Sequence, residues 1–336
     1  MRNAKLPQVG IVIPNYNNAA YVVEAIESAA HQTVRGIEVV VIDDASTDNS
    51  DEVIRETLAK MADPRFRYIR LEENCGQTGA VRRGVAELKA PFVCFLDSDD
   101  VWYENFIERH LAAHINTDFP VGFTYCDSHF INGDSELVAS TAWWFERPYD
   151  DLSHRPVFPG TIPRIDVKAA RAEFPLNPTM VLHAQWSPTW SSNSTAAMMF
   201  RRDIVMLALP PNDKELRLYL DFYLSTFTCL LVGGIAIHEA LYCYRMHGKN
   251  KHSDGLVLGG TSQTSRKKFE PISLGVMELI LTVMLERKSV ITELVDIDHY
   301  DQAVRAMRQA ISRAGPPSLI RRMRSSIRRM RSSLRL

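Results

Sequence analysis

The sequence predicts an α/β protein built on a doubly wound, mostly parallel sheet with helices on both faces. Four short runs rich in β-branched residues recur within the first hundred positions, and amphipathic stretches separate them. Polar residues follow three of these runs directly. Strands that alternate with helices in this way are typical of β-α-β units, in which consecutive strands lie parallel.

The predicted strands are short and mostly apolar, as expected of parallel strands that are buried on both faces. They cover residues 9–13, 37–42, 67–71 and 92–96. The predicted helices have apolar residues at three- and four-residue spacing and a polar opposite face. They cover residues 19–32, 50–61 and 77–89. Further along, residues 121–125 and 136–139 flank an Asn-Gly-Asp turn and predict a β-hairpin.

Polar segments follow three of the predicted strands at their carboxyl ends. These segments are residues 14–18, 43–48 and 97–100. In a doubly wound sheet, ligands bind beyond the carboxyl ends of the strands. We therefore expect the functional site at this edge of the sheet.

The last of these segments contains three carboxylates within four residues, at Asp97, Asp99 and Asp100. Without a cation they would repel one another and lose favourable hydration. Oxygen ligands suit Mg²⁺ or Mn²⁺, and Mg²⁺ is usually shared between one or two carboxylates and the phosphates of a substrate. The segment therefore predicts a metal-bound nucleoside diphosphate. The alternative is that these aspartates cap a helix over residues 101–114.

Two common phosphate-binding loops are missing from the sequence. A dinucleotide-binding domain needs a glycine-rich turn after its first strand, and residues 14–18 contain no glycine. The P-loop sequence G-x-x-x-x-G-K-[ST] does not occur in the chain. Phosphate must therefore be neutralised by a metal and by side chains.

Four ordered motifs resemble the nucleotide-sugar domain of family 2 inverting glycosyltransferases, whose fold is called GT-A. They are I-V-I-P-N-Y-N-N (11–18), V-V-V-I-D-D-A-S-T-D-N-S (39–50), N-C-G-Q-T-G-A-V-R-R-G (74–84) and F-L-D-S-D-D-V-W (95–102). Weaker similarity returns in A-M-M-F-R-R (197–202), L-D-F-Y-L (220–224) and Y-R-M-H (244–247). The resemblance implies transfer of a sugar from a nucleoside-diphosphate donor, with UDP favoured, to a hydroxyl of a glycan or lipid-linked acceptor.

The resemblance also implies a metal site. Asp97 and Asp99 match the D-x-D element of the family, in which we expect Asp99 to bind Mn²⁺ or Mg²⁺ and Asp97 to lie nearer the ribose or the sugar. His247 resembles a downstream histidine that contacts phosphate or metal, although a lone histidine is as readily an ordinary polar residue.

The nucleotide would contact the three polar segments and the third predicted helix. Tyr16 offers a flat ring or a hydroxyl to the base or ribose. One of Asp43 and Asp44 would accept a hydrogen bond from the nucleotide, and the other is alternatively the cap of a turn. Arg82 would reach the nucleotide or its phosphates as a charged fork. The predicted nucleotide-sugar-binding residues are Pro14, Tyr16, Asn17, Asp43, Asp44, Arg82, Asp97 and Ser98.

Inversion at the anomeric carbon requires one general base to take the proton of the acceptor hydroxyl. Asp221 aligns with the aspartate of a Glu-Asp pair in the family and is the predicted base. Leu220 stands where the family usually has the glutamate. This departure leaves three other carboxylates as candidates, at Asp203, Asp213 and Glu215.

Two other functions remain open from the sequence. A sugar-1-phosphate nucleotidyltransferase also uses a nucleotide and a metal, but its glycine-rich N-terminal signature is missing. A catalytically inactive nucleotide-sugar-binding module is compatible with the change at Leu220. We expect no nucleic-acid partner.

Composition suggests a cytoplasmic protein. The five cysteines are odd in number and show no C-x-x-C spacing, as expected in a reducing compartment. We expect no signal peptide, because residues 1–5 lead directly into a predicted strand, and no apolar run is long enough to cross a membrane.

The predicted organisation is a nucleotide-sugar-binding half (1–115), an acceptor-binding and catalytic half (116–255) and a helical extension (256–336). The extension ends in a basic amphipathic segment, 318–336, in which I-R-R-M-R-S-S occurs twice. From Gln302 onward there are ten arginines and no acidic residue, against 29 basic and 40 acidic residues elsewhere. We expect this segment to bind an anionic membrane at its inner face, with docking on the acidic body as the alternative.

Overall fold

The computed structural model describes residues 8–117, 121–141, 180–183, 186, 194–212, 215–248, 250 and 263–314. The chain divides into two compact units, residues 1–261 and 262–336. The candidate base Asp213 and the basic segment 318–336 lie outside the described residues, as does most of the aromatic-rich region between residues 142 and 193.

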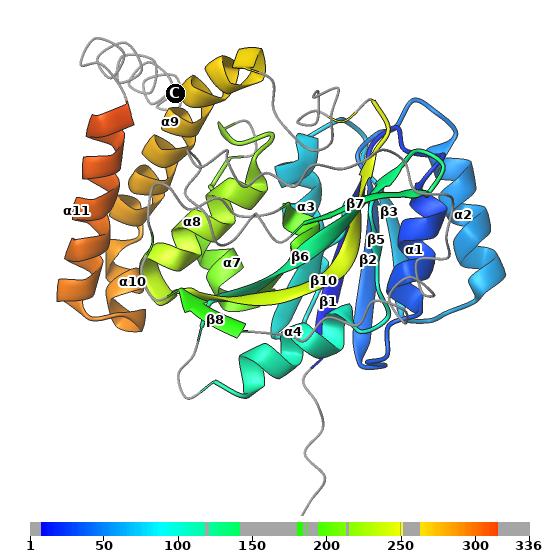
Figure 1. The fold of residues 1–336 in the computed structure, drawn as a ribbon, viewed down its shortest axis with the longest axis horizontal. Coiled ribbons are helices and arrows are strands. Elements are labelled where there is room, and N and C mark those ends of the chain that lie inside the picture. Colours follow the sequence, from blue (N-terminus) through cyan, green and yellow to red (C-terminus); the bar gives the residue numbers. More distant parts are fainter. Residues whose placement is uncertain are drawn as a thin grey trace, which may run out of the picture. The chain divides into compact units, whose positions relative to one another are not determined.

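The first unit is built on a sheet of ten strands in the order β3-β2-β1-β4-β9-β6-β10-β5, with β7 beside β6 and β8 beside β10 (Figure 1). The strands are β1 (Val9–Asn15), β2 (Ile37–Asp43), β3 (Phe66–Arg70), β4 (Phe92–Phe95), β5 (Val101–Trp102), β6 (Phe123–Asn132), β7 (Leu137–Thr141), β8 (Met180–His183), β9 (Met198–Arg201) and β10 (Gly234–Met246). Its helices are α1 (Val22–Ala30), α2 (Ser50–Met61), α3 (Gly76–Glu87), α4 (Phe106–Ile115), α7 (Arg202–Ala208) and α8 (Leu220–Val232).

The four predicted strands are confirmed as the parallel half of the sheet, because β1 pairs in parallel with β2 and β4, and β2 pairs in parallel with β3. The expectation that all four are buried is wrong for β3. This strand lies at the edge of the sheet and none of its residues is fully buried. Arg67 and Arg70 of β3 form ion pairs with neighbouring carboxylates instead.

The remaining strands make the sheet mixed. The strand β9 lies between β4 and β6 and is antiparallel to both. The predicted hairpin is confirmed as β6 and β7, which pair antiparallel. A helix over residues 101–114 is wrong at its start, because Val101 and Trp102 pair with β10 as the short strand β5. The helix α4 begins only at Phe106, so the carboxylates of residues 97–100 do not cap it.

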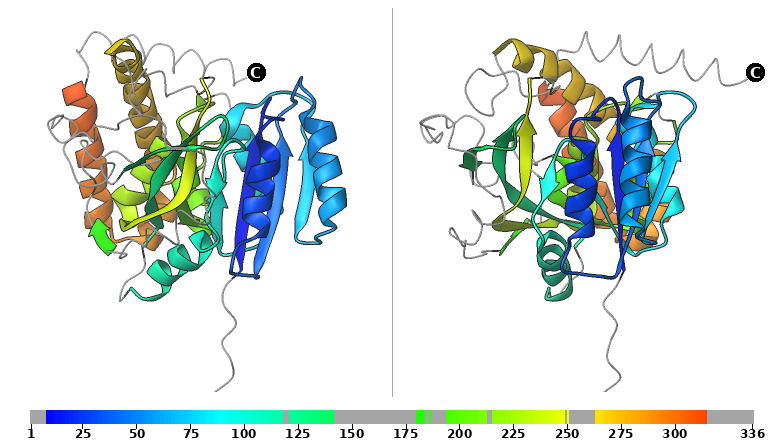
Figure 2. Two further views of the ribbon diagram at one scale, coloured as in Figure 1. Left: turned by 45° about the vertical axis from the view of Figure 1, so that its right-hand side comes forward. Right: turned by 90° about the vertical axis from the view of Figure 1, so that its right-hand side faces the viewer.

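The helices α1 and α2 lie side by side on one face of the sheet (Figure 2). Right-handed crossovers place α3, which leads back to β4, on the opposite face. There α3 packs closely on β1, because a Cβ added at Gly84 would lie 2.4 Å from Val12 Cγ1. This close packing holds the second half of α3 against the middle of β1.

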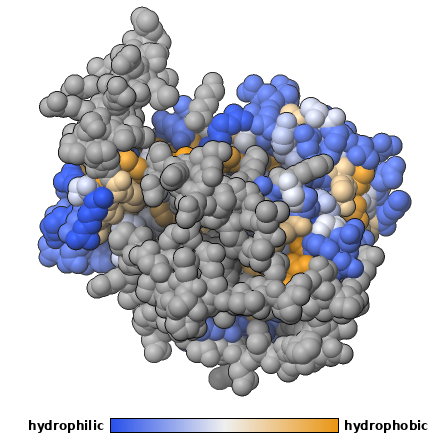
Figure 3. Space-filling model, turned by 45° about the horizontal axis from the view of Figure 1, so that its top comes forward, coloured by the Kyte–Doolittle hydropathy of each residue, from blue (hydrophilic) through white to orange (hydrophobic). Residues whose placement is uncertain are grey.

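The core of the first unit is formed by apolar side chains of both halves of the sheet. The rings of Phe95, Phe123 and Phe200 are fully buried and contact one another across β4, β6 and β9. No disulfide joins the five cysteines, and all but Cys75 are buried. On the face seen in Figure 3, hydrophilic residues cover most of the described surface, and apolar residues form only small patches.

The second unit contains α9 (Gln263–Glu286), α10 (Lys288–Leu294) and α11 (Ile297–Ala314). The helices α9 and α11 pack together, and the Tyr300 hydroxyl donates to the carbonyl of Met284 at 3.2 Å. Among the helices that the structure describes, none is long and apolar enough to cross a membrane.

Candidate active site

The parallel strands β1, β2 and β4 bring the three polar segments to one edge of the sheet, as the sequence predicts. Asn15 and Asp43 are register partners at the ends of β1 and β2. The Asn15 Nδ2 amide donates to Asp43 Oδ1 at 3.1 Å and to Ser46 Oγ at 3.2 Å. Ser46 in turn donates to Asp43 Oδ1, so the fully buried Asp43 carboxylate joins the first two segments.

Asn17 holds the same two segments together from outside. Its φ of 57° is left-handed, a conformation that asparagine tolerates better than most residues. The Asn17 Oδ1 atom accepts from the backbone N–H of Thr47 at 2.7 Å and of Asp48 at 3.3 Å. Pro14 lies within β1, and Tyr16 beside Asn17 is 43% exposed at this edge.

Asp44 anchors the loop that leads into α3. Its two carboxylate oxygens accept from the backbone N–H groups of Cys75 at 2.7 Å and Gly76 at 2.8 Å. Burial raises the pKa of Asp44, while these two hydrogen bonds and the charge of Arg217 act to lower it. The sequence allows one of Asp43 and Asp44 to be the cap of a turn, and in the structure Asp44 caps the loop before α3. A contact of Asp44 with the nucleotide stays a prediction.

Arg82 lies in α3, and its guanidinium donates to the carbonyl of Pro210 between α7 and α8. This bond ties α3 to the segment that leads into α8. The predicted contact of Arg82 with phosphate stays a prediction.

Asp97 is held on both sides by neutral donors. Gln77 Nε2 donates to Asp97 Oδ1 at 2.9 Å, and Thr195 Oγ1 donates to Asp97 Oδ2 at 3.0 Å. The pKa of Asp97 is raised to about 7, mainly by burial and then by the charges of Asp99 and Asp221, against the opposing effect of the hydrogen bonds from Thr195 and Gln77. An aspartate in this setting is stabilised in its charged form by a cation.

Asp99 and His247 form a pair at the same edge. His247 Nε2 lies 3.0 Å from Asp99 Oδ2, although the two residues are far apart in the sequence. The His247 side chain is almost fully buried and stacks on the ring of Tyr21 with centroids 4.8 Å apart. Ser98, between the two aspartates, accepts a hydrogen bond from Asn18 Nδ2 at 3.0 Å.

The residues at this edge fit a divalent cation that shares its ligands with a bound phosphate. In the described part of the chain, no group of three or more His, Cys, Asp or Glu side chains forms a complete metal site. The Asp99 carboxylate and the His247 imidazole nevertheless converge, and Asp100 behind them is buried with its Oδ2 atom lacking a hydrogen bond. Burial and the charges of Asp99 and Asp97 raise the pKa of Asp100 well above its usual range. A cation that receives further oxygen ligands from a diphosphate would relieve this repulsion.

Asp221 is the second residue of α8. Its Oδ1 atom accepts from the backbone N–H of Phe222 at 2.7 Å, and its charge raises the pKa of Asp97. Leu220 beside it is fully buried, so the position that departs from the family motif faces the core. Of the other candidate bases, Asp203 is exposed and pairs with Arg201 at 3.1 Å, and Glu215 is exposed.

Similarity to known proteins shows which family the chain belongs to. The family model of glycosyl transferase family 2 matches residues 10–206, more than half of the chain. The chain belongs to glycosyl transferase family 2. It is 27% identical over 245 residues, or 73% of its length, to an uncharacterized glycosyltransferase of Nostoc sp., of which the match covers 66%.

A second relative of this family 2 chain has a more specific description. The chain is 29% identical over 118 residues to the putative teichuronic acid biosynthesis glycosyltransferase TuaG of Bacillus subtilis. The match covers 35% of the chain and 46% of TuaG. The chain thus spans less than two thirds of the length of either relative.

The solved structures show the fold. The S. aureus TarS fragment 1–349 in complex with UDP superposes with a TM-score of 0.53 at 17% identity, covering 88% of this chain and 69% of that one. The complex of the same fragment with UDP-GlcNAc gives a TM-score of 0.52 at 17% identity, covering 93% and 82%. The family 2 chain therefore has the GT-A fold that its motifs predict.

Sequence reasoning missed three residues of the site in this family 2 chain. Gln77 lies within a motif that resembles the family, and its contact with Asp97 could have been suspected from that. Arg245 lies within another such motif but was given no role, because only the fold shows its burial. Thr195 precedes the nearest motif by two residues and carried no signal.

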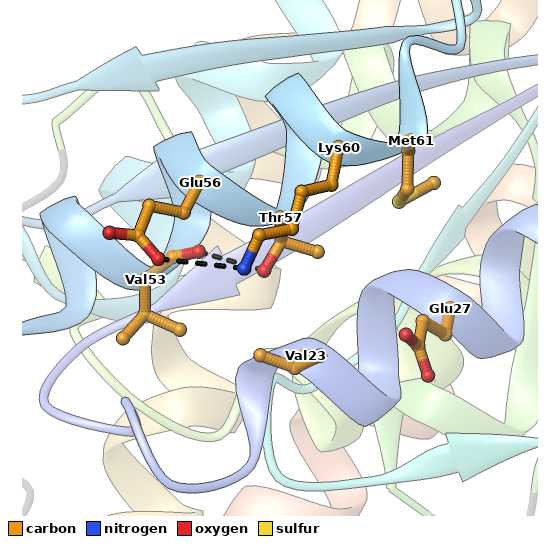
Figure 4. Close-up of a pocket in the computed structure, with 7 residues that line it drawn as sticks. All are labelled: Val23, Glu27, Val53, Glu56, Thr57, Lys60 and Met61. Atoms are coloured by element: carbon orange, nitrogen blue, oxygen red, sulfur yellow. Dashed lines mark hydrogen bonds and ion pairs between the residues drawn. The ribbon is translucent and has the colours of Figure 1, made fainter.

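A pocket of about 300 Å³ lies elsewhere in the first unit, between α1 and α2 (Figure 4). Its lining residues are Val23, Glu27, Val53, Glu56, Thr57, Lys60 and Met61. Glu56 and Lys60 form an ion pair at 3.7 Å across one turn of α2. None of the candidate site residues lines this pocket.

Proposed function

We propose that the chain is an inverting glycosyltransferase that moves a sugar from a nucleoside-diphosphate donor to an acceptor hydroxyl. The observation that carries this proposal is the gathering of Asp97, Asp99 and Asp221 from two distant parts of the sequence. Asp99 contacts His247, and Asp221 is close enough to raise the pKa of Asp97. The proposed site would combine residues suited to a metal-bound diphosphate with a carboxylate suited to act as base.

Asp99 and His247 would hold Mn²⁺ or Mg²⁺ together with the diphosphate of the donor. When bound, the cation supplies Lewis-acid stabilisation of the departing diphosphate. Asp97, fixed by Gln77 and Thr195, would orient the ribose or the transferred sugar. The exposed ring of Tyr16 would pack on the base or ribose, beside the segment that Asn17 fixes.

Asp221 would accept the proton of the acceptor hydroxyl while that oxygen attacks the anomeric carbon. A carboxylate is ionised at neutral pH, so correct placement matters more than a shifted pKa. The backbone N–H of Phe222 donates to Asp221 Oδ1 and helps to fix the orientation of the carboxylate. A single displacement inverts the configuration of the anomeric carbon, and it needs only this one base.

The donor is proposed to carry UDP, and the acceptor to be a growing glycan or a lipid-linked saccharide. TarS was solved with UDP and with UDP-GlcNAc, and TuaG is named for teichuronic acid biosynthesis. The ligands of TarS support the choice of UDP, and the name of TuaG supports a role in bacterial polysaccharide synthesis. The basic segment 318–336 would bring the enzyme to the inner face of the membrane, where lipid-linked acceptors lie.

A scan of nucleotide sugars tests the proposed reaction without knowledge of the acceptor. The protein is incubated with UDP-, GDP- and dTDP-linked sugars and Mn²⁺ or Mg²⁺, and released nucleoside diphosphate is measured. Release from one donor class, abolished by EDTA, is the expected result. Formation of pyrophosphate from a nucleoside triphosphate and a sugar phosphate would instead indicate a nucleotidyltransferase. Donor binding without release, even with a panel of glycan acceptors, would indicate an inactive binding module.

A further inference from the structure

Arg245 of β10 has the largest side chain among the fully buried residues of the described chain. It lies two residues before His247, and its backbone N–H donates to Asp100 Oδ1 at 2.9 Å. Its guanidinium Nε atom donates to the backbone carbonyl of Asp99 at 2.7 Å. One arginine therefore contacts Asp99 of the D-x-D element with its side chain and the following residue, Asp100, with its main chain.

The other guanidinium nitrogens join two further segments. Nη2 donates to the Glu24 carboxylate of α1 at 2.9 Å. Nη1 donates to Ser135 Oγ at 2.7 Å and to the carbonyl of Asn132 at 3.3 Å, both in the turn between β6 and β7. Ser135 completes the ring by donating to Glu24 Oε2 at 2.9 Å.

This network explains how the charged guanidinium of Arg245 can be buried away from water. A buried cation is costly unless it is paired and its hydrogen-bond donors are satisfied. Here Glu24 supplies the opposite charge, and each guanidinium nitrogen has an oxygen acceptor. Arginine donates here from three separate nitrogens of one rigid plane, whereas lysine carries all its N–H donors on a single nitrogen.

Arg245 also reaches the other half of the metal-binding pair. Its guanidinium lies 4.9 Å from the centroid of the Tyr21 ring, in cation–π contact. The same ring stacks on the His247 imidazole. The orientation of His247 therefore depends on Tyr21, and that of Tyr21 on Arg245.

We propose that Arg245 is a positioning residue that fixes Asp99 and His247 in the arrangement required to bind a divalent cation with the donor diphosphate. This inference rests on the proposed function, because it assigns a cause to the metal affinity of that site. Arg245 acts on Asp99 through its backbone carbonyl and on His247 through Tyr21, and it touches neither metal nor substrate itself. Glu24 and Ser135 hold Arg245 in turn. Groups that orient metal ligands in this way typically contribute 10- to 100-fold to metal affinity.

The test measures Mn²⁺ binding by electron paramagnetic resonance with saturating UDP, or with GDP if the donor scan selects guanosine. The variants Arg245→Lys and Glu24→Gln loosen the network without altering Asp99 or His247. We expect the dissociation constant of Mn²⁺ to rise about 10- to 100-fold in Arg245→Lys and by a smaller factor in Glu24→Gln. UDP binding in EDTA is expected to stay within about twofold of wild type, since Arg245 does not contact the nucleotide.

Arg65→Lys is the matched control, because Arg65 is partly buried and, like Arg245, joins a carboxylate and a backbone carbonyl. It pairs with Asp63 at 2.6 Å and with the Ala30 carbonyl at 3.1 Å, outside the site. It should leave Mn²⁺ binding unchanged. Circular dichroism and thermal unfolding in EDTA show whether each variant is folded. If Arg245→Lys does not fold, the Mn²⁺ affinity of Glu24→Gln tests the proposal.

Two results would overturn the inference while the proposed function stands. One is unchanged Mn²⁺ affinity in the folded variants. The other is an equal loss of Mn²⁺ binding and of metal-free UDP binding, which would mean general loosening of the fold. Wild-type protein that binds no Mn²⁺ with any nucleoside diphosphate would contradict the proposed function and this inference with it.

Discussion

Asp221 raises the pKa of Asp97 by charge repulsion, although Asp97 follows β4 and Asp221 lies at the start of α8. The two carboxylates therefore interact electrostatically. In the proposed enzyme a cation binds beside Asp97 and reduces this repulsion, while Asp221 acts as the base. The repulsion makes the metal-free site electrostatically unfavourable, which leads to separate predictions for the two residues.

Asp221→Asn is expected to lower kcat by at least about 100-fold, the usual contribution of a positioned general base. Donor binding should change little, because asparagine keeps the size of the side chain and most of its hydrogen bonding. The measurement is turnover and donor affinity with the donor found by the nucleotide-sugar scan. Asp203→Asn is the control, since Asp203 is an exposed carboxylate paired with Arg201. Loss of activity in the control with survival in Asp221→Asn would assign the base elsewhere.

Asp97→Asn is expected to stabilise the metal-free protein at neutral pH. The pKa of Asp97 is about 7 in the folded chain, above the value of about 3.9 for an unfolded aspartate. Asp97 therefore contributes fully to folding below about pH 4, and this contribution is lost as the pH rises toward 7. Thermal unfolding in EDTA should show a Tm difference between variant and wild type that grows from pH 4 to pH 7. A difference that is constant over this range would contradict the shifted pKa.

Gly84→Ala is expected to destabilise the fold by about 1–3 kcal/mol, the usual cost of overpacking. The added Cβ would lie 2.4 Å from Val12 Cγ1, so α3 would have to move away from β1. Urea unfolding measures the change. Gly36→Ala is the matched control, because nothing lies within 4 Å of a Cβ at Gly36, and its effect should stay below about 0.5 kcal/mol. Equal stability of the two variants would show that α3 does not pack this closely.

Deletion of residues 318–336 is expected to abolish co-sedimentation with anionic liposomes at low salt while donor hydrolysis continues. The segment repeats one basic amphipathic motif, and each arginine near an anionic surface contributes about 1 kcal/mol. Neutral liposomes are the control for non-specific binding. If the full-length chain stays in the supernatant with anionic liposomes, the membrane proposal fails.

The parallel half of the sheet could be predicted from the sequence because local patterns determine it. Apolar runs and helical periodicity gave the four strands and three helices, and α2 spans the predicted residues. The strand β9 could not be found in this way, because its antiparallel position between β4 and β6 is set by contacts distant in sequence. The late start of the helix predicted from residue 101 has the same cause, since Val101 and Trp102 pair with β10.

The site residues that lie in a local sequence motif could be predicted. The contacts between distant segments of the chain could not. Asp97 and Asp99 follow a strand, and the repulsion of adjacent carboxylates is visible in the sequence itself. The contacts of Asp97 with Thr195 and of Asp99 with His247 join segments about 100 or more positions apart. No local pattern encodes such contacts. The burial of Arg245 likewise becomes meaningful only once Glu24 and Ser135 are seen around it.

Asp99 is proposed to hold a divalent cation together with the diphosphate of the donor, and the proposed function depends on this contact. Isothermal titration calorimetry of UDP binding, with Mn²⁺ and with EDTA, tests it most directly in the wild type and in Asp99→Ala. We expect Mn²⁺ to tighten UDP binding at least about tenfold in the wild type and to have no effect in the variant, whose affinity in EDTA should equal that of the wild type. An Mn²⁺ effect of the same size in both proteins, or in neither, would contradict the claim.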